Sequence, residues 1–183
     1  AFVTEQVRAF FTLPVAYGAE RSSAGDHEIK TVATTEQALA FTFGGLSNAA
    51  AVEDVLTRLQ TGGLKGTFFV TDNEVRRYPA TVRQIIAQGH EIGIAIRPKN
   101  GATAEETSQH LNKTQQFLKE KFQVTAVLVK QISGTVEEAT RSAVAVAGAT
   151  LIGQSINVIQ SKHQNYQSAE QIMNELFKPG MVS

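Results

Sequence analysis

From residue 37 onward, short apolar runs alternate with amphipathic stripes, and this alternation restricts the possible folds more than any other feature of the chain. Apolar runs of strand length separated by helical stripes are typical of βαβ units, in which helices connect parallel strands. The pattern therefore predicts an α/β protein with a mostly parallel sheet. The predicted strands are residues 38–43, 66–70, 91–96, 126–130 and 149–156.

Signals for the start and end of helices lie between these runs. Ser47 or Asn48 can cap a helix that ends at Gly62-Gly63, and Pro79 suits the first turn of a helix that ends near Gly89. Two capping boxes, each a Thr followed three residues later by a Glu, open further helices. The boxes and a last predicted helix are Thr103 with Glu106, Thr135 with Glu138, and residues 169–177.

The two ends of the chain differ from its centre. Residues 1–27 are expected to form an N-terminal extension before one domain of residues 28–183. Within that domain, Glu28 to Ala33 can pair with the first strand as a hairpin. The absence of an initial Met and of a leader segment indicates a mature form or a fragment, and the last three residues look like the start of an interrupted strand.

Charge and composition exclude several classes of partner. The 17 basic and 17 acidic residues cancel, and no run of five like charges offers a footprint for nucleic acid or an anionic membrane. The longest uncharged stretch, residues 142–161, contains polar side chains and two glycines, so it predicts a helix end and a strand rather than a membrane span. The lack of cysteine removes thiol catalysis and disulfides but leaves the compartment open.

The residues that follow the predicted strands form the candidate site, because chemistry in parallel α/β folds gathers where strands end. Carboxylates are scarce at these positions, and Asp72 suits a helix cap better than a base. The four histidines have no metal-ligand spacing, and His90, directly before a strand, is expected to be structural. The candidate ligand-binding residues are Asp72, Arg97, Lys99, Lys130 and Asn157.

Several runs occur in an order that characterises one family. They are Ala38-Leu-Ala-Phe-Thr-Phe43, Gly66-Thr-Phe-Phe-Val-Thr71, Tyr78-Pro79, Gly89-His-Glu-Ile-Gly93 and Phe177-Lys-Pro-Gly180. Together they resemble the polysaccharide deacetylase family, the NodB-homology domain of carbohydrate esterases. The resemblance covers about residues 28–183 and implies a distorted (β/α) barrel with fewer units than the usual eight. It also implies an extracellular or cell-envelope protein.

Members of this family remove N- or O-acetyl groups from sugars with a divalent metal, which one aspartate and two histidines hold, and with a second aspartate as the base. The metal polarises the acetyl carbonyl, and the base takes a proton from water. In this sequence the position of the base falls on Gly44. The metal positions fall on Gly45, Ala95 and Lys99. The resemblance therefore implies a degenerate member without a metal or another cofactor.

Two further family motifs are also altered. The Arg-Pro-Pro-Tyr-Gly motif, which orients the base, falls on residues 130–134, where Lys130 replaces the arginine. The later Trp and Asp fall on Gln154 and Asn157, and the general-acid histidine is expected beyond Ser183.

Three roles stay open for such a domain: glycan binding in the old groove, a structural or accessory role beside an active domain of the same polypeptide, or new chemistry. The absence of Trp weakens the first role. An active deacetylase with a relocated site, or with a partner domain, is the alternative. If Arg97, Lys99 and Lys130 converge, with Asp72 as their only local carboxylate, the pocket suits an anion such as a uronate or phosphate. The competing expectation is that the Arg97 and Lys99 side chains extend from their loop into water.

Overall fold

A computed structural model describes residues 28–30, 40–99 and 101–153. The predicted N-terminal extension, the end of the last predicted strand, the helix over residues 169–177 and Asn157 lie outside the described residues. No helix in the described part combines the length and the apolar character needed to cross a bilayer.

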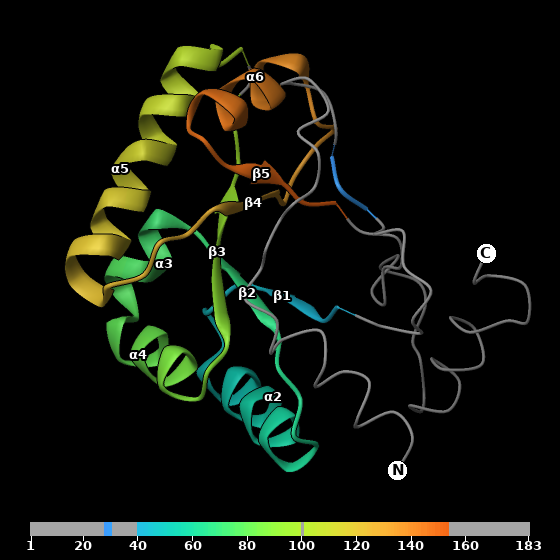
Figure 1. The fold of residues 1–183 in the computed structure, drawn as a ribbon, viewed down its shortest axis with the longest axis vertical. Coiled ribbons are helices and arrows are strands. Elements are labelled where there is room, and N and C mark those ends of the chain that lie inside the picture. Colours follow the sequence, from blue (N-terminus) through green and yellow to red (C-terminus); the bar gives the residue numbers. More distant parts are fainter. Residues whose placement is uncertain (1–27, 31–39, 100, 154–183) are drawn as a thin grey trace, which may run out of the picture. The chain divides into compact units, whose positions relative to one another are not determined.

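Five parallel strands form one sheet in the order β1-β2-β3-β4-β5, and helices connect them (Figure 1). Adding each strand beside the previous one through a helical crossover is the arrangement of a (β/α) barrel. The predicted α/β fold is therefore confirmed. The strands are β1 Thr42–Gly44, β2 Thr67–Val70, β3 Glu91–Ile96, β4 Leu128–Gln131 and β5 Thr150–Leu151. The helices are α2 Ala49–Thr61, α3 Asp72–Arg77, α4 Pro79–Ala87, α5 Ala104–Phe122 and α6 Glu138–Val146.

The two faces of the sheet have different partners. Alternate strand residues such as Phe68, Ile94 and Val129 are buried in one hydrophobic cluster with apolar residues of the helices. Further members of this cluster are Val52 and Leu56 of α2, Val82 and Ile85 of α4, Leu111 and Leu118 of α5, and Val144 of α6. The helices therefore cover one side of the sheet, as Figure 1 shows for α3, α4 and α5.

The opposite face of the sheet is concave. Lys130 of β4 and Thr42 of β1 are separated by β2 and β3 in the sheet, yet the Lys130 Nζ donates a hydrogen bond to the Thr42 Oγ1 at 3.3 Å. Strands that are three positions apart can meet in this way only when the sheet curls strongly. This inner face is therefore the inside of an open barrel.

Phe69 occupies the centre of the inner face, and Gly93 makes room for it. The two residues are register partners on β2 and β3, and a Cβ built at Gly93 would lie 2.6 Å from the Phe69 Cε1 and 3.2 Å from the Leu128 carbonyl oxygen. Only glycine leaves enough space here, so the ring lies directly against the backbone of β3.

Most helix ends follow the sequence signals. The Asn48 side chain accepts a hydrogen bond from the Ala51 N–H at 3.1 Å, and Gly89 has the predicted left-handed conformation with φ +75°. The Thr103 capping box is present as predicted. The box predicted at Thr135 is wrong, because Glu137 precedes α6 without a side-chain cap.

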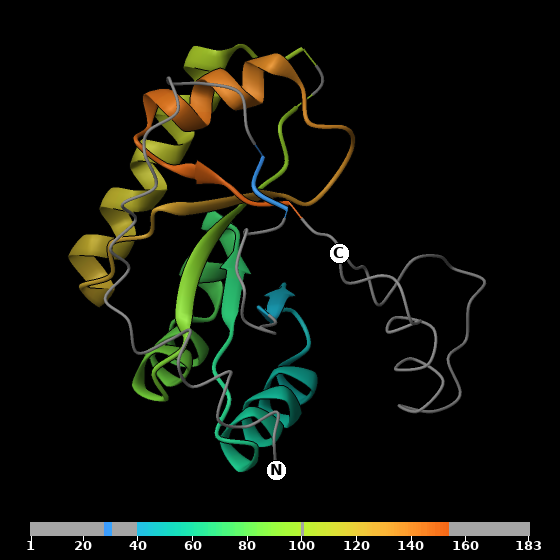
Figure 2. The ribbon, with the colours of Figure 1, turned by 45° about the vertical axis from the view of Figure 1, so that its right-hand side comes forward.

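Two further expectations need correction. Helix α3 was not among the predicted helices, since six residues are too few to show an apolar period. Ile29 forms a parallel bridge with Ile152, beside β5, so the hairpin expected with the first strand is wrong for the described residues 28–30 (Figure 2). The short run around Ile29 predicts a strand, but no turn signal joins it to the next strand, so the sequence does not say which strand it pairs with.

We expect Gly93→Ala to lower the free energy of unfolding by about 1–3 kcal/mol, because the new methyl group would overlap the Phe69 ring and the backbone of β4. Gly44→Ala is the matched control, since a Cβ at Gly44 meets no atom within 4 Å. Urea unfolding followed by circular dichroism compares the two variants. Equal stability of both would contradict the close approach of Phe69 to β3.

Candidate functional site

The candidate site lies where β1, β2, β3 and β4 end and their loops begin. Gly44 is the last residue of β1 and is exposed, and Gly45 follows with φ +87°. Gly45 is anchored by its N–H, which donates to the Phe69 carbonyl at 3.3 Å. The loop therefore turns sharply at the position where the sequence aligns the base and a metal ligand of the family.

Glu74 holds this loop in place. Its Oε1 accepts a hydrogen bond from the Leu46 N–H at 2.8 Å, and its Oε2 accepts from the N–H and the hydroxyl of Thr71 at 2.9 and 2.8 Å. The Thr71 hydroxyl in turn accepts from the Glu74 N–H, which completes a capping box at the start of α3. One carboxylate thus joins the ends of β1 and β2. This role of Glu74 was not predicted, although the Thr-x-x-Glu spacing from Thr71 to Glu74, directly after a strand, was a readable signal.

The charged form of Glu74 is favoured. Burial of the carboxyl opposes ionisation, but the hydrogen bonds from Thr71 and Leu46, together with the positive charge of Arg97, hold its pKa below the ordinary value. Arg97 itself is exposed at the end of β3. Glu74 is therefore a structural anion rather than a free base.

The residues at the family's metal positions do not fit a divalent cation. Gly45 and Ala95 carry no donor atom, and Ala95 is buried in β3 with only 2% of its surface exposed. Lys99 is exposed, and a protonated amine does not ligate a metal. Across the described ranges, no group of three or more His, Asp or Glu side chains lies close enough to hold a metal.

Lys130 is the half-buried cation of the inner face. Its Nζ lies 3.3 Å from the Thr42 Oγ1 and 5.7 Å from the centre of the Phe69 ring. Burial lowers the pKa of Lys130, and the negative charge of Glu28 opposes this shift only in part. The residue aligned with the family's arginine therefore lies on the inner face, beside a neutral hydroxyl.

The other predicted site residues have their own partners. Asp72 lies in the first turn of α3 and accepts from the Arg76 guanidinium at 2.9–3.1 Å, so it is neither the cap nor a free carboxylate. The expectation that Asp72 is the only local carboxylate is wrong, since Glu74 lies near Arg97. Hydrogen bonds from Thr103 and, more weakly, the charge of Lys99 lower the pKa of Glu106.

His90 is buried at the opposite, N-terminal end of the strands. Its Nδ1 accepts a hydrogen bond from the Gly66 N–H at 3.4 Å, and its ring contacts Phe68. Its Nε2 has no hydrogen-bond partner among the residues that the structure describes. The expected structural role of His90 agrees with this placement, which is remote from the strand ends that carry the candidate site.

A family model described as polysaccharide deacetylase matches residues 31–152, which is two thirds of the chain. The chain belongs to the polysaccharide deacetylase family. The resemblance noted from the sequence is thereby confirmed, and the curved parallel sheet is the fold expected of the family. Among curated protein sequences, none matches the chain significantly.

Solved structures of family 4 carbohydrate esterases share the fold. A mutant of BA3943, a pseudoenzyme from Bacillus anthracis, aligns with a TM-score of 0.73 and 15% identity over 82% of this chain and 56% of that one. The peptidoglycan N-acetylglucosamine deacetylase Bc1960 aligns with a TM-score of 0.64 and 21% identity, over 74% of this chain and 63% of that one. The family 4 carbohydrate esterase from Streptomyces lividans aligns with a TM-score of 0.58 and 20% identity, over 66% of this chain and 64% of that one. The chain thus spans less than two thirds of the length of these polysaccharide deacetylase relatives.

We expect Gly45→Asp to be destabilising by about 1–2 kcal/mol, because a side chain at φ +87° is strained and its Cβ would lie 3.5 Å from the Glu74 Oε1. Gly44→Asp adds the same charge one residue earlier, in open space, and we expect a change within about 0.5 kcal/mol. Urea unfolding at neutral pH measures both. A larger loss for Gly44→Asp would contradict this description of the loop.

We expect Glu74→Gln to lower the free energy of unfolding by about 1–3 kcal/mol at neutral pH, because an amide cannot accept all three hydrogen bonds. The pKa of Glu74 is lower in the folded state than its ordinary value of 4.5, so the wild-type advantage is full above that value. It decreases as the pH falls through the folded-state pKa. Unfolding curves between pH 7 and about pH 3 compare the two proteins. A difference that does not change with pH would show that the charge of Glu74 is not what holds the loop.

Proposed function

We propose that this chain is a polysaccharide deacetylase-like domain that does not catalyse deacetylation. In this proposal it serves as a carbohydrate-associated or structural accessory module of a longer cell-envelope protein. The observation that carries the proposal is the set of residues at the family's reactive positions. Gly44 offers no base, and Gly45, Ala95 and Lys99 offer no metal ligand.

The surroundings of these positions also disfavour a relocated metal. The Glu74 carboxylate contacts the altered loop through the Leu46 N–H, and its oxygens already accept three hydrogen bonds. The ammonium group of Lys130 adds a positive charge to the inner face, and that charge repels a divalent cation. Without a Lewis acid or a base, an acetyl amide lacks both contributions that lower its hydrolytic barrier.

The structural relatives support the accessory role by analogy of fold. BA3943 is described as a family 4 pseudoenzyme, so this fold occurs without activity in at least one other protein. Other relatives are described as peptidoglycan deacetylases, and peptidoglycan is a cell-wall polymer. This is the basis for proposing a cell-envelope location and a glycan or an active domain as the partner.

We expect the purified chain to retain no stoichiometric zinc, cobalt or nickel after dialysis, and to release no acetate above background from acetylated glucosamine oligomers. Elemental analysis measures the first and an acetate assay the second, with an active family 4 esterase as the positive control. Circular dichroism of the assayed sample shows that the protein is folded, which controls for misfolded protein.

Bound metal together with acetate release would overturn the proposal in favour of a deacetylase with a relocated site. That result would be decisive if a single substitution of a residue at the strand ends, such as Asp72→Asn, abolished the turnover. Acetate release that is unaffected by metal chelators would instead indicate different chemistry on the same fold.

A further inference from the structure

His90 is a buried histidine whose hydrogen bonding requires the uncharged ring. It lies directly before β3 with 7% of its surface exposed, whereas His110 on α5 is exposed. The His90 Nδ1 accepts the hydrogen bond from the Gly66 N–H at 3.4 Å, so this nitrogen carries no proton. The proton of the neutral ring is therefore on Nε2. That atom is buried and has no partner within the described part of the chain.

This arrangement does not fit the charged ring. A second proton would occupy Nδ1, and its N–H would then point at the Gly66 N–H, so that two donors face each other. The bond would be lost, and a positive charge would be left in a buried place. Protonation of His90 is therefore opposed by the geometry of the folded state.

The bond joins the starts of two neighbouring strands. Gly66 directly precedes β2 and His90 directly precedes β3, and the Glu91 N–H donates to the Gly66 carbonyl oxygen at 3.0 Å. The His90 ring also lies 5.5 Å from the Phe68 ring, which stacks on Phe43 of β1 at 5.0 Å. The imidazole therefore belongs to a row of rings that crosses β1, β2 and the residue before β3.

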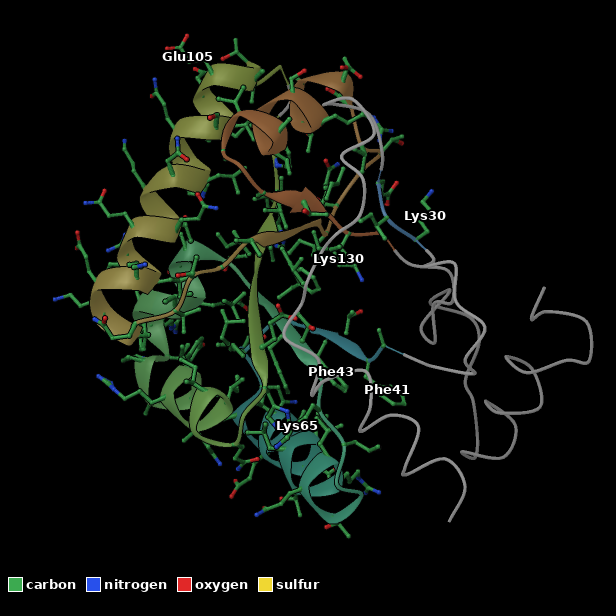
Figure 3. The ribbon with its side chains drawn as sticks, in the orientation of Figure 1. Lys30, Phe41, Phe43, Lys65, Glu105 and Lys130 are labelled. Atoms are coloured by element: carbon green, nitrogen blue, oxygen red, sulfur yellow. The ribbon has the colours of Figure 1, made fainter. Side chains whose placement is uncertain are left out.

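The nearest described charge opposes a positive ring. Burial and, to a smaller extent, the positive charge of Lys65 lower the pKa of His90. The Lys65 Nζ donates to the Gln88 carbonyl oxygen, two residues before His90. Its side chain lies near α2 and well apart from Lys130 (Figure 3). The field of Lys65 therefore acts in the same direction as the hydrogen-bond geometry.

The other elements beside His90 supply no compensating negative charge. Glu91 is exposed, and its Oε2 accepts a hydrogen bond from the Thr67 hydroxyl at 2.8 Å. Strands β1 and β2 contain no titratable residue, and the charged side chains of α2 and α4 are exposed. The Phe68 ring is tilted by 55° at 5.5 Å, so it attracts a cation only weakly. Among the described residues, none therefore stabilises an imidazolium at this place.

We propose that His90 is a pH-sensitive switch at the N-terminal end of the sheet. Proton uptake at Nδ1 breaks the bond to Gly66, and the charged ring leaves its buried place for water. The starts of β2 and β3 then separate locally and expose the rings of Phe43 and Phe68. Loss of the proton reverses the step. This inference goes beyond the proposed accessory role and does not depend on it.

Amide hydrogen exchange, measured by NMR on the full chain, tests the switch through the protection factors of Gly66 and Glu91. The pKa of His90 is lower in the folded state than its ordinary value of 6.5, so the neutral ring stabilises the closed state fully above that value. This stabilisation is lost as the pH falls towards the folded-state pKa. We expect the protection factors to fall below pH 6.5 by up to about tenfold per pH unit, because opening takes up one proton.

His90→Asn and His110→Asn are the matched variants, and circular dichroism checks that each is folded. Asparagine at position 90 offers an acceptor oxygen and does not titrate, so the protection of Gly66 should depend less on pH. His110→Asn removes an exposed histidine and should behave as the wild type. The same pH dependence in His90→Asn and the wild type would overturn the proposal.

A second measurement needs no variant. An NMR titration of the wild-type imidazole should show the Nε2–H form of His90 at neutral pH and a midpoint below 6.5. A midpoint at or above 6.5, or protection of Gly66 that does not change between about pH 7.5 and pH 5, would also overturn the proposal.

Discussion

The close approach of Phe69 to the backbone of Gly93 is the contact on which the inner face depends. A ring that lies against β3 leaves room above it for the Lys130 side chain, which reaches Thr42 on β1. A side chain at Gly93 would force the ring towards the centre and occupy the path of Lys130. The position of the Phe69 ring, above which the half-buried Lys130 side chain lies, therefore depends on the absence of one Cβ.

A second constraint acts where the strands end, because the Glu74 carboxylate binds the loop after β1 and the start of α3. The loop of Gly44 and Gly45 lies where the family aligns two carboxylates, and here a single carboxylate from α3 holds it through the Leu46 N–H. The same group caps α3, so the geometry of the rim is kept while its oxygens are occupied by hydrogen bonds. This loop is thus held by a neighbouring helix rather than by side chains of its own, which is consistent with the accessory role that we propose.

The fold was largely predictable from the sequence because its signals are local. The strand over residues 91–96 has the predicted bounds, and Asn48 and the Thr103 box act within a few residues of themselves. Errors arose where local signals were weak or competed. The six-residue α3 is too short to show a helical period. The Thr135 box is absent because α6 begins at Glu138, so that Glu137 and not Thr135 is the N-cap residue.

The sequence by itself determined the α/β class, the order of the strands and the family. Only the tertiary structure decided what surrounds the residues that follow the strands. The bond from Leu46 to Glu74 joins residues 28 apart, and the bond from Lys130 to Thr42 joins residues 88 apart. Contacts at such separations arise from the curvature of the sheet and the packing of its helices, and no pattern within a short window of sequence encodes them.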